Sequence, residues 1–169
     1  LVREDNKDLN ETVTYTYDAR GNILNKKTYA YTTGSLTNAT VTDTVTYSYD
    51  STWKDKLISF DGQSISYDSI GNPVAYRGFE YTWEKGRQLK SIGVDDLELA
   101  AFKYNAEGLR TEKAIYYGDT TTYTWSSGLL MQQNDGTNTL NFSYSPDGRP
   151  LGVKFNGTNY YYIYNLQGD

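Results

Sequence analysis

The sequence contains no cysteine and no histidine, and these two absences remove whole classes of chemistry. Without cysteine, the chain cannot form disulfides, use a thiol nucleophile or bind a metal through thiolates. Without histidine, it lacks the usual general base and the commonest metal ligand, so Ser-His-Asp and Cys-His arrangements are excluded. No glycine-rich phosphate loop precedes a helix, because the glycines stand alone at expected turn positions. We therefore predict no cofactor and no metal ion.

Long apolar segments and basic clusters are missing as well. Hydrophobic residues make up 37% of the chain, and no stretch approaches the length of a membrane-spanning helix. The net charge is −5 with acids and bases interspersed, so the basic footprints of nucleic-acid and anionic-membrane binding are absent. The sequence thus predicts no nucleic-acid partner and no direct membrane insertion. Because it starts at Leu1 and stops inside a repeat, we expect a piece of a longer protein.

Tyrosine is abundant instead, with 18 residues, and it falls in a phrase that recurs about every twenty residues. The phrase is an aromatic residue, any residue, a second aromatic and a polar turn that reaches glycine. The clearest copies are 15–22, 65–72, 102–109, 142–149 and 162–169, and looser copies stand at 81–86 and 123–128. A fixed period of this size is typical of a repeat array in which each unit packs against its neighbours.

Each copy reads as a β-hairpin. Alternation of aromatic and small polar residues has the period of a half-buried strand, and Asp followed by Gly supports a tight turn. Tyrosine, with an apolar ring and a wet hydroxyl, suits a wide, thin sheet whose two faces are partly solvated. We predict an all-β fold of consecutive antiparallel hairpins, with residues 1–169 as one continuous array. The predicted structural turn residues are Asp18, Gly21, Asp68, Gly71, Gly86, Gly108, Gly128, Gly148 and Gly168.

Two segments depart from the pattern. The copy at 47–50 lacks glycine at the expected place, so we expect a longer turn there, with Trp53 covering hydrophobic surface. Trp53 lies outside the repeat register and is the better candidate for contact with a ligand, whereas the repeated aromatics favour packing between strands. The last strand, Tyr160–Tyr164, has no charge or proline to protect its edge, so we expect edge-to-edge self-association or pairing with a partner chain.

The phrase Tyr-Asp-x-x-Gly, seen at 17–21 and 67–71, resembles the YD repeats of Rhs (rearrangement hot spot) proteins, which bacterial wall-associated proteins, insecticidal toxin complexes and teneurin shells share. Copies at 104 and 164 carry Asn in place of Asp, and the copy at 144 carries Ser. The resemblance implies a curved, spiralling sheet that forms part of a β-shell. It also implies an extracellular or cell-surface bacterial protein. The expected partners are the rest of the parent shell and an enclosed C-terminal effector.

Three functions remain open on this reading. The leading hypothesis is a non-catalytic structural segment of the shell, which encapsulates or presents the effector, and therefore no enzyme. The alternative is a module that binds carbohydrate or a cell-surface protein through exposed aromatics such as Trp53. The third is a hydrolase with paired carboxylates. Its candidate acids are already explained by turns, where Asp is favoured; they are Asp18, Asp50, Asp68, Asp95, Asp96, Glu107 and Asp147.

Overall fold

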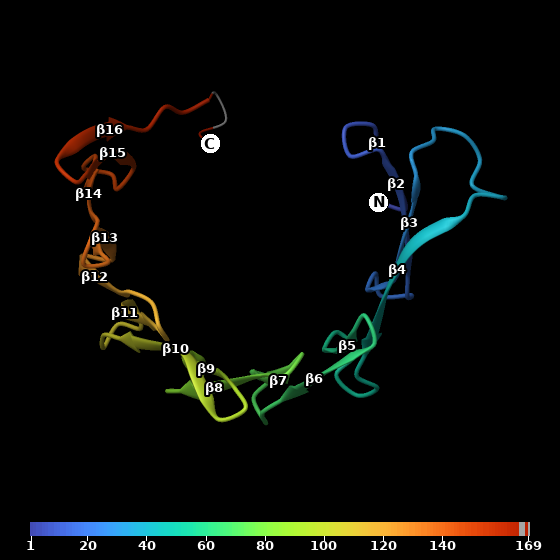
Figure 1. Ribbon diagram of the computed structural model, residues 1–169, viewed down its shortest axis with the longest axis horizontal. Helices are drawn as coiled ribbons and strands as arrows, with labels where there is room; N and C mark the ends of the chain where they lie inside the picture. Colours follow the sequence, from blue (N-terminus) through green and yellow to red (C-terminus); the bar gives the residue numbers. More distant parts are fainter. Residues whose placement is uncertain (166–167, 169) are drawn as a thin grey trace. The chain divides into compact units, whose positions relative to one another are not determined.

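The computed structural model describes residues 1–165 and residue 168. The regular secondary structure in that part of the chain consists of β-strands, without any helix. The predicted all-β fold of consecutive antiparallel hairpins is therefore confirmed. The chain divides into two compact units, Leu1–Arg77 and Gly78–Asp169. Figure 1 colours the first from blue to green and the second from green to red. No helix that could cross a bilayer occurs among the described residues.

The first unit holds seven strands, each next to its neighbour in chain order. They are β1 (Arg3–Asn6), β2 (Glu11–Tyr17), β3 (Ile23–Ala30), β4 (Val41–Tyr49), β5 (Leu57–Phe60), β6 (Gln63–Tyr67) and β7 (Pro73–Tyr76). All consecutive pairs from β1 to β7 are antiparallel.

The second unit holds nine strands in the same arrangement. They are β8 (Phe79–Glu84), β9 (Gln88–Val94), β10 (Leu97–Tyr104), β11 (Arg110–Ile115), β12 (Thr120–Ser126), β13 (Leu129–Asn134), β14 (Thr139–Tyr144), β15 (Pro150–Phe155) and β16 (Thr158–Tyr161). All consecutive pairs from β8 to β16 are antiparallel.

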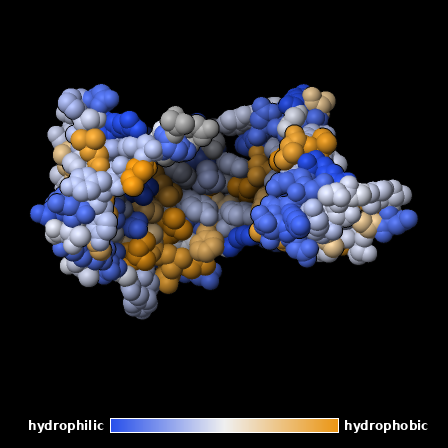
Figure 2. Space-filling model, turned by 90° about the horizontal axis from the view of Figure 1, so that it is seen from above, coloured by the Kyte–Doolittle hydropathy of each residue, from blue (hydrophilic) through white to orange (hydrophobic). Residues whose placement is uncertain are grey.

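Few side chains are buried, as the thin, partly solvated sheet predicted from the tyrosine content requires. The buried hydrophobic residues of the described chain are Val13, Ala100 and Phe102. Large apolar side chains such as Ile163, Tyr117 and Leu151 are exposed instead, and Figure 2 shows orange residues scattered over the visible surface among polar ones. Among the described residues, stability must therefore come mainly from strand pairing and from contacts between neighbouring hairpins, because so few side chains are buried.

A β-bulge interrupts the register at the second aromatic of the repeat. In the first copy the shift falls between Thr16 and Tyr17, and in the third between Ser66 and Tyr67. The same shift precedes Tyr49, Trp83, Tyr104, Trp125 and Tyr144. A bulge bends its strand and turns the next side chain to a new direction, so each copy aims its second aromatic in the same way.

The turn glycines have positive φ angles, as expected for Gly21, Gly71, Gly108 and Gly148 in tight turns. Gly21 has φ 93° and Gly71 has φ 88°. The other five predicted positions have φ between 78° and 91°; they are Gly86, Gly108, Gly128, Gly148 and Gly168. The turns are not all alike, however, because Ser127 and Gly128 form a two-residue connection with both φ values positive.

The last strand is shorter than predicted. We expected Tyr160–Tyr164, but β16 spans Thr158–Tyr161. The Tyr162 amide still donates to the Leu151 carbonyl over 3.1 Å. The ladder then ends because β15 itself begins at Pro150, and the next pair, Pro150 opposite Ile163, falls at a non-hydrogen-bonded position. The predicted bounds are therefore wrong, while self-association through this edge stays a prediction.

Candidate functional site

The second aromatic of the repeat ties its hairpin to the strand before it. The Tyr49 hydroxyl donates to the Ile23 carbonyl at 3.0 Å, and the Tyr67 hydroxyl donates to the Leu57 carbonyl at 2.5 Å. Tyr104 reaches Leu89 at 2.9 Å and Tyr144 reaches Leu130 at 2.8 Å. Tyr17 bonds the carbonyl of Leu1 and Tyr164 that of Pro150 in the same way. We call these bonds the tyrosine latch.

Tryptophan replaces tyrosine in the latch without losing the bond. The Trp125 Nε1–H donates to the Arg110 carbonyl at 2.7 Å. The second aromatic is always Tyr or Trp, which can donate, whereas the first includes Ile65, Phe102 and Phe142. This contrast is visible in the sequence, but the prediction from the repeat period missed it. That prediction considered how the aromatic rings pack and did not consider the O–H and N–H groups of Tyr and Trp as hydrogen-bond donors.

Burial raises the pKa of the latch phenols of Tyr49, Tyr67 and Tyr144. A phenol ionises near pH 10 when it is unperturbed. These hydroxyls therefore stay protonated, and remain donors, throughout the neutral range. The latch is a structural arrangement and contains no general base.

The Asp of the repeat caps its own turn. Asp18 Oδ1 accepts from the Arg20 amide at 2.8 Å and from the Asn22 amide at 2.9 Å. Asp68 accepts from the amides of Ile70 and Asn72 at 3.0 and 2.9 Å. Burial acts to raise the pKa of both carboxyl groups, but the hydrogen bonds from these partners outweigh it and hold each pKa below its usual value. The turn role expected for these acids therefore has a geometric basis.

Trp53 occupies the longer turn between β4 and β5. Asp50 Oδ1 accepts from the Trp53 amide at 2.6 Å, and the side chain of Trp53 is 52% exposed. Its ring lies against the Gly71 turn, where a Cβ on Gly71 would stand 2.7 Å from the indole. Lys56 Nζ lies 5.4 Å from the ring centroids of both Trp53 and Tyr67. Trp53 thus covers the neighbouring turn with part of its ring, and the remainder faces solvent.

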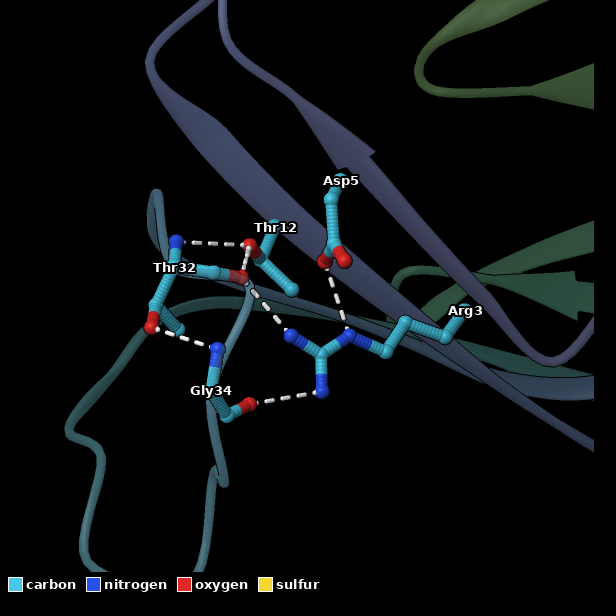
Figure 3. A network of polar contacts seen from close by, with 5 residues as sticks. All are labelled: Arg3, Asp5, Thr12, Thr32 and Gly34. Carbon is cyan, nitrogen blue, oxygen red and sulfur yellow. Dashed lines mark hydrogen bonds and ion pairs between the residues drawn. The ribbon is translucent and has the colours of Figure 1, made fainter.

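A polar network anchors the loop between β3 and β4 (Figure 3). Arg3 donates to the Thr32 carbonyl at 2.7 Å and to the Gly34 carbonyl at 2.9 Å, and its Nε lies 2.7 Å from Asp5 Oδ1. The hydroxyl of the fully buried Thr12 donates to the Thr32 carbonyl at 2.9 Å and accepts from the Thr32 amide at 3.0 Å. Residues 3 and 12 on the first two strands therefore fix where this loop leaves the sheet.

The anchored loop borders a cavity of about 570 Å³. Hydroxyl, amide and methyl groups dominate its lining, which is Ala30, Tyr31, Thr32, Ser35, Thr37, Asn38, Ala39, Thr40 and Thr42. This lining has no carboxylate and no cationic side chain, so it supplies no acid and base pair for hydrolysis. No cluster of three metal-ligating His, Cys, Asp or Glu occurs among residues 1–165 and 168.

Known proteins resemble this chain over its whole length. No family model matches it. The tRNA3(Ser)-specific nuclease WapA of Bacillus spizizenii is 31% identical over 175 residues, which is 100% of this chain and 7% of that protein. The tRNA nuclease WapA of Bacillus subtilis strain 168 matches to the same extent. The tRNA(Glu)-specific nuclease WapA of Bacillus subtilis subsp. natto is 31% identical over 68% of this chain and 5% of its own length.

Solved structures give weaker matches. A crystal structure of TcdB2–TccC3 covers 90% of this chain and 9% of its own, with 14% identity and a TM-score of 0.46. The Photorhabdus luminescens Tc holotoxin pore covers 94% of this chain and 12% of its own, with 12% identity and a TM-score of 0.40. At the level of the broad family, the sequence relatives support the resemblance to Rhs and YD-repeat proteins.

Two predictions need correction. The sequence led us to expect a non-catalytic structural segment and no enzyme. Three relatives with 31% identity are all named tRNA nucleases, which contradicts both expectations. Composition misled us because it describes only this segment, and the segment spans about 7% of the first two relatives. These relatives also give no support to the carbohydrate or cell-surface binding alternative.

Proposed function

We propose that the protein that carries this chain is a toxin that cleaves tRNA. One observation carries the proposal: the whole chain aligns at 31% identity with proteins named as tRNA nucleases. The chain spans about 7% of those relatives, so the activity belongs to the larger protein in this proposal.

The proposed substrate class is tRNA, with no particular tRNA specified. The segment is 31% identical both to a nuclease named for tRNA3(Ser) and to one named for tRNA(Glu). A region shared to the same degree by enzymes with different named substrates is a poor candidate for choosing between them. We therefore place the choice of tRNA outside this chain.

Further features of the proposal follow from the repeats. Residues 1–169 would form one continuous YD-repeat array that associates with the rest of a shell and with the effector of the toxin. The predicted turn residues would hold the tight turns between the strands of that array. The half-exposed Trp53 would be available for contact with a ligand. The free edge of β16, which pairs only with β15 among the described residues, would accept a further strand or a second copy. An extracellular or cell-surface location, secreted or held at the cell wall, suits such a toxin.

The proposal is tested by incubating the purified complete protein with total bacterial tRNA and resolving the products on a denaturing gel. We expect discrete tRNA fragments that increase with time. A heat-unfolded sample is the control for contaminating ribonucleases. Many ribonucleases survive heating, so contamination would still produce fragments in this sample, whereas a clean preparation should produce none. Intact tRNA after incubation with protein that is folded by circular dichroism would refute the proposed function.

A further inference from the structure

Arg110, the first residue of β11, has a charged side chain that lacks both an ion pair and an acceptor for its Nε–H within the described chain. Its guanidinium lies over the ring of Phe102, with Cζ 4.6 Å from the centroid. Among residues 1–165 and 168 it forms no ion pair, and its buried Nε has no hydrogen-bond partner. Buried donors almost always have an acceptor, which is water or a ligand when the protein supplies none. The Nε of Arg110 therefore calls for an acceptor from outside the chain.

A second cation projects from the same face of the sheet. The register pairs Tyr104 with Arg110 and Phe102 with Lys113. Directly paired residues share a face, so both cations flank the aromatic side chains of β10. Lys113 also has no ion pair among the described residues.

The nearest carboxylate in sequence does not neutralise this pair. Glu112 pairs with Lys103 in the register, and its Oε1 lies 2.8 Å from the Lys103 Nζ. The bulge between Lys103 and Tyr104 separates this ion pair from Arg110 and places it on the opposite face. The sequence shows alternating charges at 110–113, but the fold sorts them into a neutral pair on one face and two cations on the other.

A second buried atom without a partner lies on the adjacent hairpin. Gln88 Oε1 is buried and has no hydrogen bond, and the Nε2 of the same amide lies 3.4 Å from where a Cβ on Gly108 would stand. Gly108 belongs to the turn that leads into Arg110. An amide adapts to either a donor or an acceptor by rotating about its last torsion, so Gln88 adds an adaptable polar group beside the turn that leads into Arg110.

We propose that Arg110 and Lys113 form an oxyanion site that binds phosphate groups of an RNA backbone. The planar Arg fork matches phosphate oxygens through two parallel N–H donors, and the Nε of Arg110 has no hydrogen-bond partner within the described chain. Cationic side chains that contact the backbone are one of the means by which proteins bind single-stranded RNA. The site rests on the proposed function for its choice of RNA, and it revises the expectation of no nucleic-acid partner.

The number of cations fixes the expected salt dependence. Each phosphate contact to single-stranded nucleic acid contributes about −0.7 to the slope of log affinity against log salt concentration, so two contacts give about −1.4. Raising salt from 50 to 200 mM, a fourfold change, should then weaken binding about sevenfold. Removing one cation should leave a slope of about −0.7, so that the same fourfold rise in salt weakens the affinity by about 2.6-fold.

The test measures fluorescence anisotropy of a labelled single-stranded oligouridylate titrated with the 169-residue chain at several salt concentrations. The variants are Arg110→Gln, Lys113→Gln and, as the matched control, Lys103→Gln, which removes a cation from the other face of the same hairpin. We expect the first two to weaken binding and to lower the slope by about 0.7 each, and the control to match the wild type. Arginine Nε–H resonances, followed during titration with inorganic phosphate, report on Arg110 even if one variant fails to fold.

Several outcomes would overturn the site. One is equal binding by Arg110→Gln, Lys113→Gln and Lys103→Gln, and another is no response of the Arg110 Nε–H resonance to phosphate. Competition by polyglutamate at least as strong as that by RNA would point to an acidic peptide partner and would also refute the RNA assignment. None of these results depends on cleavage. Equal binding by all variants, together with tRNA cleavage by the complete protein, would refute this site alone, whereas RNA binding here without cleavage would refute only the proposed function.

Discussion

Replacing Tyr104 with phenylalanine isolates the contribution of the tyrosine latch. The substitution keeps the ring and removes only the hydroxyl that donates to the Leu89 carbonyl at 2.9 Å. A typical hydrogen bond contributes about 0.5–1.5 kcal/mol to stability, so Tyr104→Phe should lower the free energy of unfolding by about 1 kcal/mol. Burial of the ring is preserved, so the whole loss is attributable to the bond and to the carbonyl it leaves behind.

Tyr123→Phe is the matched control for this experiment. Tyr123 is the first aromatic of its copy, and its hydroxyl has no hydrogen bond among the described residues. Its removal should change stability by less than about 0.5 kcal/mol, the usual range for surface substitutions. The assay is urea unfolding followed by circular dichroism, comparing midpoints at an unchanged slope. Equal losses for Tyr104→Phe and Tyr123→Phe would refute the latch as a specific contribution to stability.

Three further substitutions test other parts of the fold. Gly71→Ala should destabilise the chain more than Gly21→Ala, because both glycines have positive φ but only Gly71 has the Trp53 ring within 2.7 Å of a new Cβ; equal urea midpoints would contradict this. Asp68 has a lowered folded pKa, so its contribution is present above its unfolded pKa of about 3.9 and is lost as the pH falls through the folded value. Asp68→Asn should therefore lose less stability than the wild type between pH 6 and pH 2. Parallel curves of the free energy of unfolding against pH for the two proteins would show that the carboxylate contributes nothing. Arg3→Gln should free the 31–40 loop, which limited proteolysis would detect as faster cleavage there, whereas an unchanged cleavage rate would show that Thr12 alone holds the loop.

The sequence predicted the hairpins because their signals are local. Period-two alternation and the Asp-to-Gly turn act within about eight residues, and the strands beside Gly21 and Gly71 appear where that pattern puts them. The end of β16 was missed because it depends on where the neighbouring strand β15 begins, which the sequence of the last repeat does not contain.

The latch and the proposed oxyanion site could not be derived in the same way. The Tyr49 donor lies 26 residues from the carbonyl it meets, and the bulge before Tyr49 sets its direction. Likewise, the separation of Arg110 from Glu112 depends on one extra residue in the register between β10 and β11. A one-residue change in register moves side chains to the other face, and the period-two alternation of the strands does not by itself predict it.

Sequencing of the tRNA pool after the complete protein is expressed inside bacterial cells tests the central proposal most directly. If the protein is a tRNA-cleaving toxin, discrete new tRNA ends should accumulate as growth stops, while ribosomal RNA and DNA stay intact. Growth arrest with an intact tRNA pool, or with general damage to ribosomal RNA or DNA, would contradict the account.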